Sequence, residues 1–71
     1  MKLSARNELR GTVTAIDLGT VMATVTITLD DSQQTITAAI TKQAVESLEL
    51  KVGSPACAVI KATEVMVGID D

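Results

Sequence analysis

Apolar and polar residues alternate along two neighbouring segments in the first half of the chain. In residues 21–29 the even positions are mostly threonine and the odd positions are apolar, namely Val21, Ala23, Val25, Ile27 and Leu29. A period of two is typical of a strand with one buried face. Residues 34–40 repeat the alternation, and the polar residues 30–32 between the two segments predict a tight turn. We therefore expect a β-hairpin.

A further strand is predicted before this hairpin. Residues 8–17 are rich in β-branched side chains, which favour strands. We expect this strand to bury Leu9, Val13 and Ile16. Gly19 interrupts the pattern and predicts a turn that leads into the hairpin.

The character of the chain changes after the hairpin. Within residues 42–50, Val45 and Leu48 are three positions apart and Ala44 lies on the same side, which is typical of a short amphipathic helix. Thr41 is a suitable N-cap, because its hydroxyl can accept a hydrogen bond from an amide of the first helical turn. We expect the remaining amides at this helix start to be free to bind an anion.

Two last strands are predicted over residues 56–60 and 64–69, joined near Ala62. The order is then three strands, one helix and two strands. This layout predicts an all-β fold, a five-stranded OB-like partly open barrel with one short helix between the third and fourth strands. No repeat or linker divides the sequence, so we expect residues 1–71 to form a single domain.

The composition favours an assembly of several copies. The chain has 71 residues, of which 46% are apolar and none is aromatic. So short a domain buries only about 60% of its unfolded surface, and without aromatic rings each core position contributes less area. The single Cys57 allows no disulfide within the chain, and the lack of histidine argues against zinc. Oligomerisation is the remaining common source of stability, so we expect a homo-oligomer.

Other classes of protein find little support in the sequence. A net charge of −3 and the lack of aromatic residues argue against nucleic-acid binding, since single-strand binders of the OB class combine positive charge with aromatic stacking. The chain has no histidine and no motif that pairs a nucleophile with a base, so we do not expect an enzyme. No signal peptide and no apolar run of membrane-spanning length are visible, so we expect a cytoplasmic protein without a membrane partner.

Two segments are rich in hydrogen-bond donors. Near the start, Ser4, Arg6 and Asn7 lie close together, and near the end Lys61 follows an apolar run and precedes Ala62. The nearest carboxylates are those of Glu8 and Glu64. A set of donors with so few acceptors suits an oxyanion.

Four short segments, in this order, give the sequence a specific resemblance. They are SARN (4–7), GTVMA (19–23), AAIT (38–41) and KATEV (61–65). Together they resemble the molbindins, or Mop proteins, which are also called TOBE or molybdate-binding domains. The resemblance covers residues 2–67. It implies an OB-like fold, a homohexamer built as a trimer of dimers, and storage of molybdate or tungstate at subunit interfaces.

The resemblance also implies the residues of the site. Ser4, Arg6, Lys61 and the backbone at Ala62 match positions that contact the oxyanion, and Thr41 matches a contact made from another subunit. Asn7 completes the first donor segment. Three positions after this threonine the family often has a serine, where this chain has Ala44 and so lacks a hydroxyl. A second class of site, near a threefold axis, is implied at Gly19, Thr20 and Val21.

Three alternatives stay open at this point. The protein could be a molybdate-responsive sensor that acts together with a separate protein. It could be a structural oligomer that has lost its anion site. A nucleic-acid-binding OB-fold protein is the third alternative, and it predicts salt-dependent retention of oligonucleotides.

Overall fold

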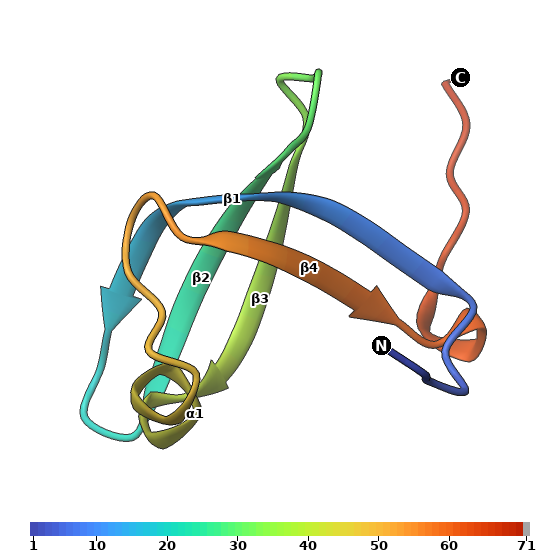
Figure 1. Cartoon of the computed structure of the whole chain (residues 1–71). Coiled ribbons are helices and arrows are strands. Elements are labelled where there is room, and N and C mark those ends of the chain that lie inside the picture. The colour runs from blue at the N-terminus through green and yellow to red at the C-terminus, as the bar shows by residue number, and fades with distance from the viewer. Residues whose placement is uncertain (71) are drawn as a thin grey trace.

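In the described part of the chain, one antiparallel sheet of four strands and a single short α-helix make up the fold (Figure 1). Residues 1–70 are described by a computed structural model. The elements along the chain are β1 (Asn7–Leu18), β2 (Met22–Leu29), β3 (Thr35–Thr41), α1 (Lys42–Ser47), β4 (Pro55–Ile60) and the 3₁₀ turn η1 (Ala62–Glu64). The strands lie in the order β3-β2-β1-β4. The predicted all-β class, with one helix after the third strand, is confirmed.

The predicted fifth strand is wrong. Residues 65–70 follow η1 as a segment that pairs with no strand in the described part of the chain. Figure 1 shows this segment running away from the sheet to the C-terminus. An extended segment becomes a strand only where its backbone groups meet those of a neighbouring strand. Here η1 directs the chain away from the sheet before such pairing can begin.

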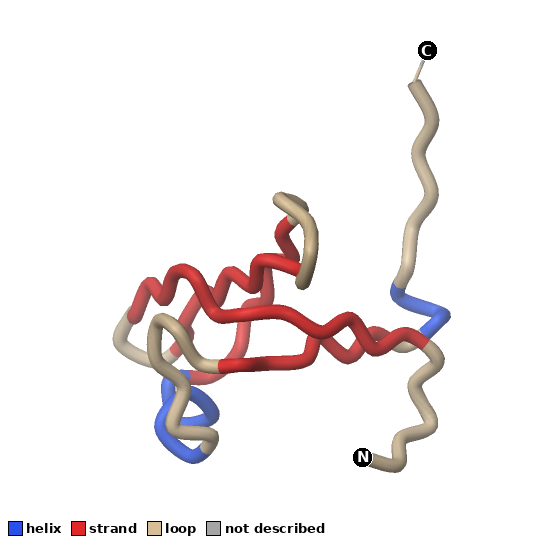
Figure 2. The backbone as a smooth tube through the Cα atoms, turned by 45° about the horizontal axis from the view of Figure 1, so that its top comes forward, coloured by secondary structure: helices blue, strands red, loops and turns tan. Residues whose placement is uncertain are grey.

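The sheet curls because the two halves of β1 pair with two different strands. Its second half, Gly11–Leu18, pairs with β2, and its first half, Asn7–Thr12, pairs with β4. In Figure 1, β4 therefore crosses in front of β2 and β3, and the tube in Figure 2 shows the same curl from another side. Gly11 is buried at the junction, where a side chain would collide with the carbonyl of Thr28 and lie 2.8 Å from Ile27 Cγ2.

A β-bulge in β1 explains why its buried residues do not follow one simple alternation. The register with β2 shifts between Val13 and Ala15, so that Thr14 is an extra residue. Residues on the core side are odd-numbered up to the fully buried Val13, whereas Ile16 packs against the core after the bulge. Val13 is buried as predicted, and Leu9 and Ile16 are partly buried against the core, on the same side as Val13 because of the bulge.

The predicted hairpin forms, and its apolar face supplies half of the buried core residues in the described chain. β2 pairs with β3 in antiparallel register, from Met22 opposite Thr41 to Thr28 opposite Thr35. The buried core contains only small and medium-sized side chains: Val13, Ala23, Val25, Ile27, Val45 and Ala58. Val21, which the alternation placed inside, lies in the turn before β2 and is 68% exposed.

The helix begins as predicted but ends three residues early. The Thr41 hydroxyl accepts a hydrogen bond from the Ala44 amide at 3.0 Å and caps the helix. At the other end, Glu49 has a φ of +53°, which the helix cannot continue. The amides of Glu49 and Leu50 bond back to the carbonyls of Glu46 and Val45, which is the Schellman arrangement.

This early end changes which side chains pack against the core. Val45 is buried, and Leu50 packs against the core cluster from beyond the helix. Leu48, predicted to be buried, is instead 66% exposed. In residues 1–70, no helix combines the length and apolar character that crossing a bilayer requires.

Candidate functional site

The first group of candidate residues lies at one end of the sheet. Antiparallel pairing places Asn7, at the start of β1, opposite Ile60, at the end of β4. The side-chain amide of Asn7 donates a hydrogen bond to the Ile60 carbonyl at 3.2 Å. Figures 1 and 2 show the N-terminal segment and η1 side by side as a result. The fold therefore brings the segment with Ser4 and Arg6 next to the segment with Lys61.

The polar groups of this end face solvent. Ser4, Arg6, Lys61 and Ala62 are exposed, and Asn7 is half-buried. Within η1, the carbonyls of Lys61 and Ala62 accept hydrogen bonds from Glu64 and Val65 at 2.9 and 3.4 Å. The amide of Ala62 begins this turn and has no partner inside it. Two cations, a hydroxyl and a backbone amide are thus available at one place, while Asn7 already uses one donor to hold the two segments together.

The second group lies at the opposite end, around the start of α1. Met22 pairs with Thr41, and the Lys42 amide donates to the Val21 carbonyl at 2.7 Å. The turn formed by Gly19, Thr20 and Val21 is therefore adjacent to Thr41, and the Gly19 amide closes it by bonding to the Met22 carbonyl at 2.8 Å. Thr41, implied for the first class of site, thus shares this end of the sheet with the turn implied for the second class.

The helix start offers fewer free donors than expected. The amides of Lys42 and Ala44 are both used within the chain, by the Val21 carbonyl and the Thr41 hydroxyl. The expectation of free amides is therefore wrong for these two, and α1 has only 6 residues to contribute a dipole. What remains for a ligand is the Thr41 hydroxyl, whose oxygen already accepts the cap bond and whose hydrogen can be donated outwards.

One chain does not bring the two groups together. Asn7 and Leu18 mark the two ends of β1, which a regular strand of that length would separate by roughly 36 Å. The longest dimension of the molecule is 37 Å. No polar residue in the described chain is buried, and residues 1–70 contain no cluster of three carboxylate, cysteine or histidine side chains that could hold a metal ion. A single copy therefore presents the two groups of candidate residues as separate, solvent-facing clusters.

Exposed apolar residues border both groups, and the alternation pattern did not predict them. Leu3 precedes the first group, Leu18 and Met22 flank the turn of the second, and Val21 lies within that turn; all four are about half exposed or more. Their signal in the sequence is apolar side chains directly beside the polar motifs. Such exposed apolar surface around polar groups is typical of contacts between protein chains.

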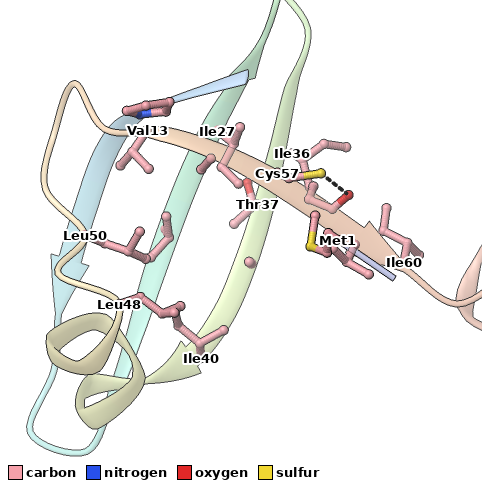
Figure 3. A pocket seen from close by; sticks show the side chains of 16 residues that line it. Met1, Val13, Ile27, Ile36, Thr37, Ile40, Leu48, Leu50, Cys57 and Ile60 are labelled. Atoms are coloured by element: carbon pink, nitrogen blue, oxygen red, sulfur yellow. Dashed lines mark hydrogen bonds between the residues drawn. The ribbon is translucent and has the colours of Figure 1, made fainter. Parts of the chain in front are cut away.

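An apolar groove of about 780 Å³ lies on the concave side of the curled sheet (Figure 3). The figure shows Leu48 and Leu50 near the helix and Met1 and Ile60 beside β4. The lining of the groove includes residues of β3 and β4, the two strands at the edges of the sheet, together with Met1.

Comparison with known proteins gives a consistent answer. The model of the TOBE domain family matches residues 3–67. A "Probable molybdenum-pterin-binding protein" of Haemophilus influenzae is 44% identical over 70 residues, which are 99% of this chain and all of that protein. The cytoplasmic molybdate-binding protein ModG, solved with molybdate bound, superposes with a TM-score of 0.91 at 48% identity, and the match covers 99% of this chain but 49% of ModG. A molybdate-binding protein from Sporomusa ovata gives a TM-score of 0.89 at 40% identity, covering 97% of this chain and all of the other.

This chain belongs to the TOBE domain family, as a member of the molbindin or Mop group. The resemblance carried by the four short segments is thereby confirmed. The family is one of molybdate-binding proteins rather than of enzymes.

Proposed function

We propose that this protein binds molybdate at the subunit interfaces of a homohexamer, a trimer of dimers, and stores and buffers the oxyanion in the cytoplasm. Its role is binding, without catalysis. One observation carries the proposal: the candidate donors lie in two exposed groups at opposite ends of the sheet, each bordered by exposed apolar side chains. A neighbouring copy that places its second group on the first completes a cage that a single chain lacks.

The two groups together have the chemistry that molybdate requires. A tetrahedral dianion presents only acceptors, so it needs donors on every side. Arg6 and Lys61 supply positive charge, Ser4 and the Ala62 amide supply further donors, and Thr41 of the neighbouring copy supplies a hydroxyl. Charge-assisted hydrogen bonds contribute ~1.5–3 kcal/mol each, so four or five give ~6–15 kcal/mol before ordering and desolvation costs. Micromolar binding requires ~8 kcal/mol.

Such a cage also has a defined selectivity. An anion that carries its own O–H group, such as monohydrogen phosphate, would find no acceptor for that proton. Tungstate has the same charge and shape as molybdate, so we include it as a ligand. The turn of Gly19, Thr20 and Val21 is proposed as the second class of site, where three copies bring their turns together around a threefold axis.

The proposal is tested with a matched pair of arginine variants. Arg6→Ala should weaken molybdate binding by ~2–3 kcal/mol, because it removes a charge-assisted donor from the cage. Arg10→Ala removes an exposed arginine of β1 outside both groups and should leave the affinity unchanged. Titration calorimetry gives the affinities, and native mass spectrometry counts subunits and bound anions in the same samples.

Three results would contradict the proposal. They are a wild-type protein that is monomeric at micromolar concentration, an assembled wild-type protein that takes up no molybdate, and an equal affinity of the two arginine variants in intact assemblies. Lys61→Ala and Lys51→Ala provide a second matched pair, since Lys51 is an exposed lysine outside both groups.

A further inference from the structure

The two cations of the first group lie just beyond the last residue pair of β1 and β4. Antiparallel pairing of these strands stops at Asn7 opposite Ile60. Continued by one residue, the same register sets Arg6 opposite Lys61, so that two positive charges follow the last pair. Like charges directly opposite each other on paired strands repel. Without an anion between them, these two strand ends therefore tend to separate.

Little else holds the N-terminal segment in place. In the described part of the chain, no hydrogen bond joins residues 1–6 to any other residue. These residues are exposed to solvent, except for the half-buried Ala5. The position of Ser4 and Arg6 relative to Lys61 therefore depends on how firmly β1 is held at its first residue.

The side chain of Asn7 acts as a clamp at this first residue. Its amide donates a hydrogen bond to the Ile60 carbonyl at 3.2 Å, and the bond is partly buried. That carbonyl belongs to the same planar peptide unit as the Lys61 amide, so the bond that holds one also orients the other. The backbone of Lys61 continues from this unit with φ −67° and ψ 141° and leads into η1. The clamp thus joins the residue after Arg6 to the residue before Lys61.

The alternation of the strands separates the clamp from the anion donors. Asn7 and Ile60 share a face with the next pair along, Leu9 and Ala58, which packs in the core. Successive side chains of a strand point to opposite faces, so continued alternation places Arg6 and Lys61 on the other face. Asn7 is therefore placed to hold the backbone of the two segments and not to contact an anion between the cations.

We propose that Asn7 is a positioning residue of the molybdate site, which holds Arg6 and Lys61 together against their mutual repulsion before the anion arrives. This inference rests on the proposed function, because it concerns the affinity of that same site. A cage that is ordered in advance spares the anion the free-energy cost of ordering it. Without the clamp, molybdate itself has to bring the two cations together.

Molybdate affinities of matched variants test this role. Asn7→Leu removes the clamp while keeping a side chain of similar size, and it should weaken molybdate binding by about tenfold in the assembled protein. Thr14→Val removes another hydrogen bond between strands, the one from Thr14 to Thr28 at 2.9 Å, outside both groups. It should leave the affinity unchanged. Titration calorimetry gives the affinities, and native mass spectrometry verifies that each variant is assembled.

A double variant distinguishes positioning from direct contact. In an Arg6→Ala background the repulsion is gone, so Asn7→Leu should weaken molybdate binding by less than about twofold. A loss in that background equal to the loss in the wild-type background would show that Asn7 contacts the anion itself, and would overturn the proposal. Asn7→Ala removes the same donor with a smaller side chain and replaces Asn7→Leu if that variant does not assemble.

A measurement without molybdate reports the clamp directly. Nuclear magnetic resonance relaxation of ¹⁵N-labelled protein gives backbone order parameters for residues 4–6 and 61–63. In Asn7→Leu these should fall below about 0.6, the range of flexible backbone, whereas wild type and Thr14→Val should stay above it. Equal order parameters in wild type and Asn7→Leu would refute the clamp, whatever the protein binds.

The two proposals can fail separately. Wild-type protein that assembles and takes up no molybdate would refute the proposed function, and the role of Asn7 in affinity with it. Wild-type protein that binds molybdate no more tightly than Asn7→Leu would refute this inference and leave the proposed function intact.

Discussion

The β2–β3 hairpin and the C-terminal segment carry the same alternation of apolar residues, yet one is buried and the other is exposed. Val25 in β2 is 2% exposed, while Val67 is 90% exposed. The hairpin finds its pairing partner within a few residues, across the turn at residues 30–34. The C-terminal segment is directed away from the sheet by η1. Alternation therefore predicts that one face of a segment will be covered, but not whether its own chain covers it.

The largest difference between the two regions should come from placing a charge in each. Val25→Asp buries a carboxylate among apolar side chains and should cost at least ~4 kcal/mol, which is enough to unfold so small a domain. Val67→Asp should leave the strands of the chain folded. Far-ultraviolet circular dichroism at a fixed concentration distinguishes these outcomes. Loss of the strand signal in both variants would show that the C-terminal segment is as necessary to the single chain as the hairpin.

A pair of glycine variants compares the same two regions with a smaller change. Gly11→Ala places a methyl group against the backbone of Thr28 and should destabilise the protein by ~2–3 kcal/mol. Gly68→Ala meets no atom within 4 Å in its own chain. It should change stability by less than ~0.5 kcal/mol. Urea denaturation of the two variants provides the measurement, and equal effects would contradict the close approach of β1 and β2 at Gly11.

A third comparison concerns Thr41, where the hairpin meets the helix. Thr41→Val removes the hydroxyl that caps α1 and should cost ~1 kcal/mol of stability. It should also weaken molybdate binding in the assembled protein, because a donor is lost from the proposed cage. Thr41→Ser keeps the hydroxyl and is the matched control. Unchanged molybdate affinity of an intact Thr41→Val assembly would remove this residue from the site.

The smallest expected effect is a gain of stability at the end of the helix. Glu49 has a left-handed backbone conformation that favours glycine, so Glu49→Gly should stabilise the protein by about 0.5–1 kcal/mol. Glu46→Gly, inside the helix, should destabilise it by ~1 kcal/mol. Thermal denaturation compares the two variants. A loss of stability in Glu49→Gly would contradict the Schellman arrangement at this position.

The bulge in β1 and the end of α1 mark the limit of what local pattern could predict for the fold. Val13 and Ile16 are three positions apart, so a regular strand would place them on opposite faces, and the bulge at Thr14 resolves this conflict. Nothing in the residue types specified the bulge. The helix ended early because Glu49 adopts a conformation more common for glycine, which its identity did not signal. The hairpin and the succession of three strands, a helix and a further strand along the chain, in contrast, could be predicted from periodicity and turn residues.

The candidate site was predictable as a set of residues but not as an arrangement. Ser4, Arg6 and Lys61 stand out as donors in an acidic chain, and the fold brings their segments together through the β1–β4 pairing. That Thr41 lies at the far end of the sheet depends on the register of three strands, which no short motif encodes. The role of Asn7 as a link to Ile60 follows from this register too.

Within residues 1–70 the core contains six buried apolar side chains, none larger than isoleucine. So little buried volume leaves the isolated chain with a narrow margin against unfolding. A partner that binds only the folded chain raises its free energy of unfolding, and this increase grows with the logarithm of the partner's concentration. The melting temperature of a protein that assembles therefore depends on its concentration as well as on its sequence. Dilution alone should lower it.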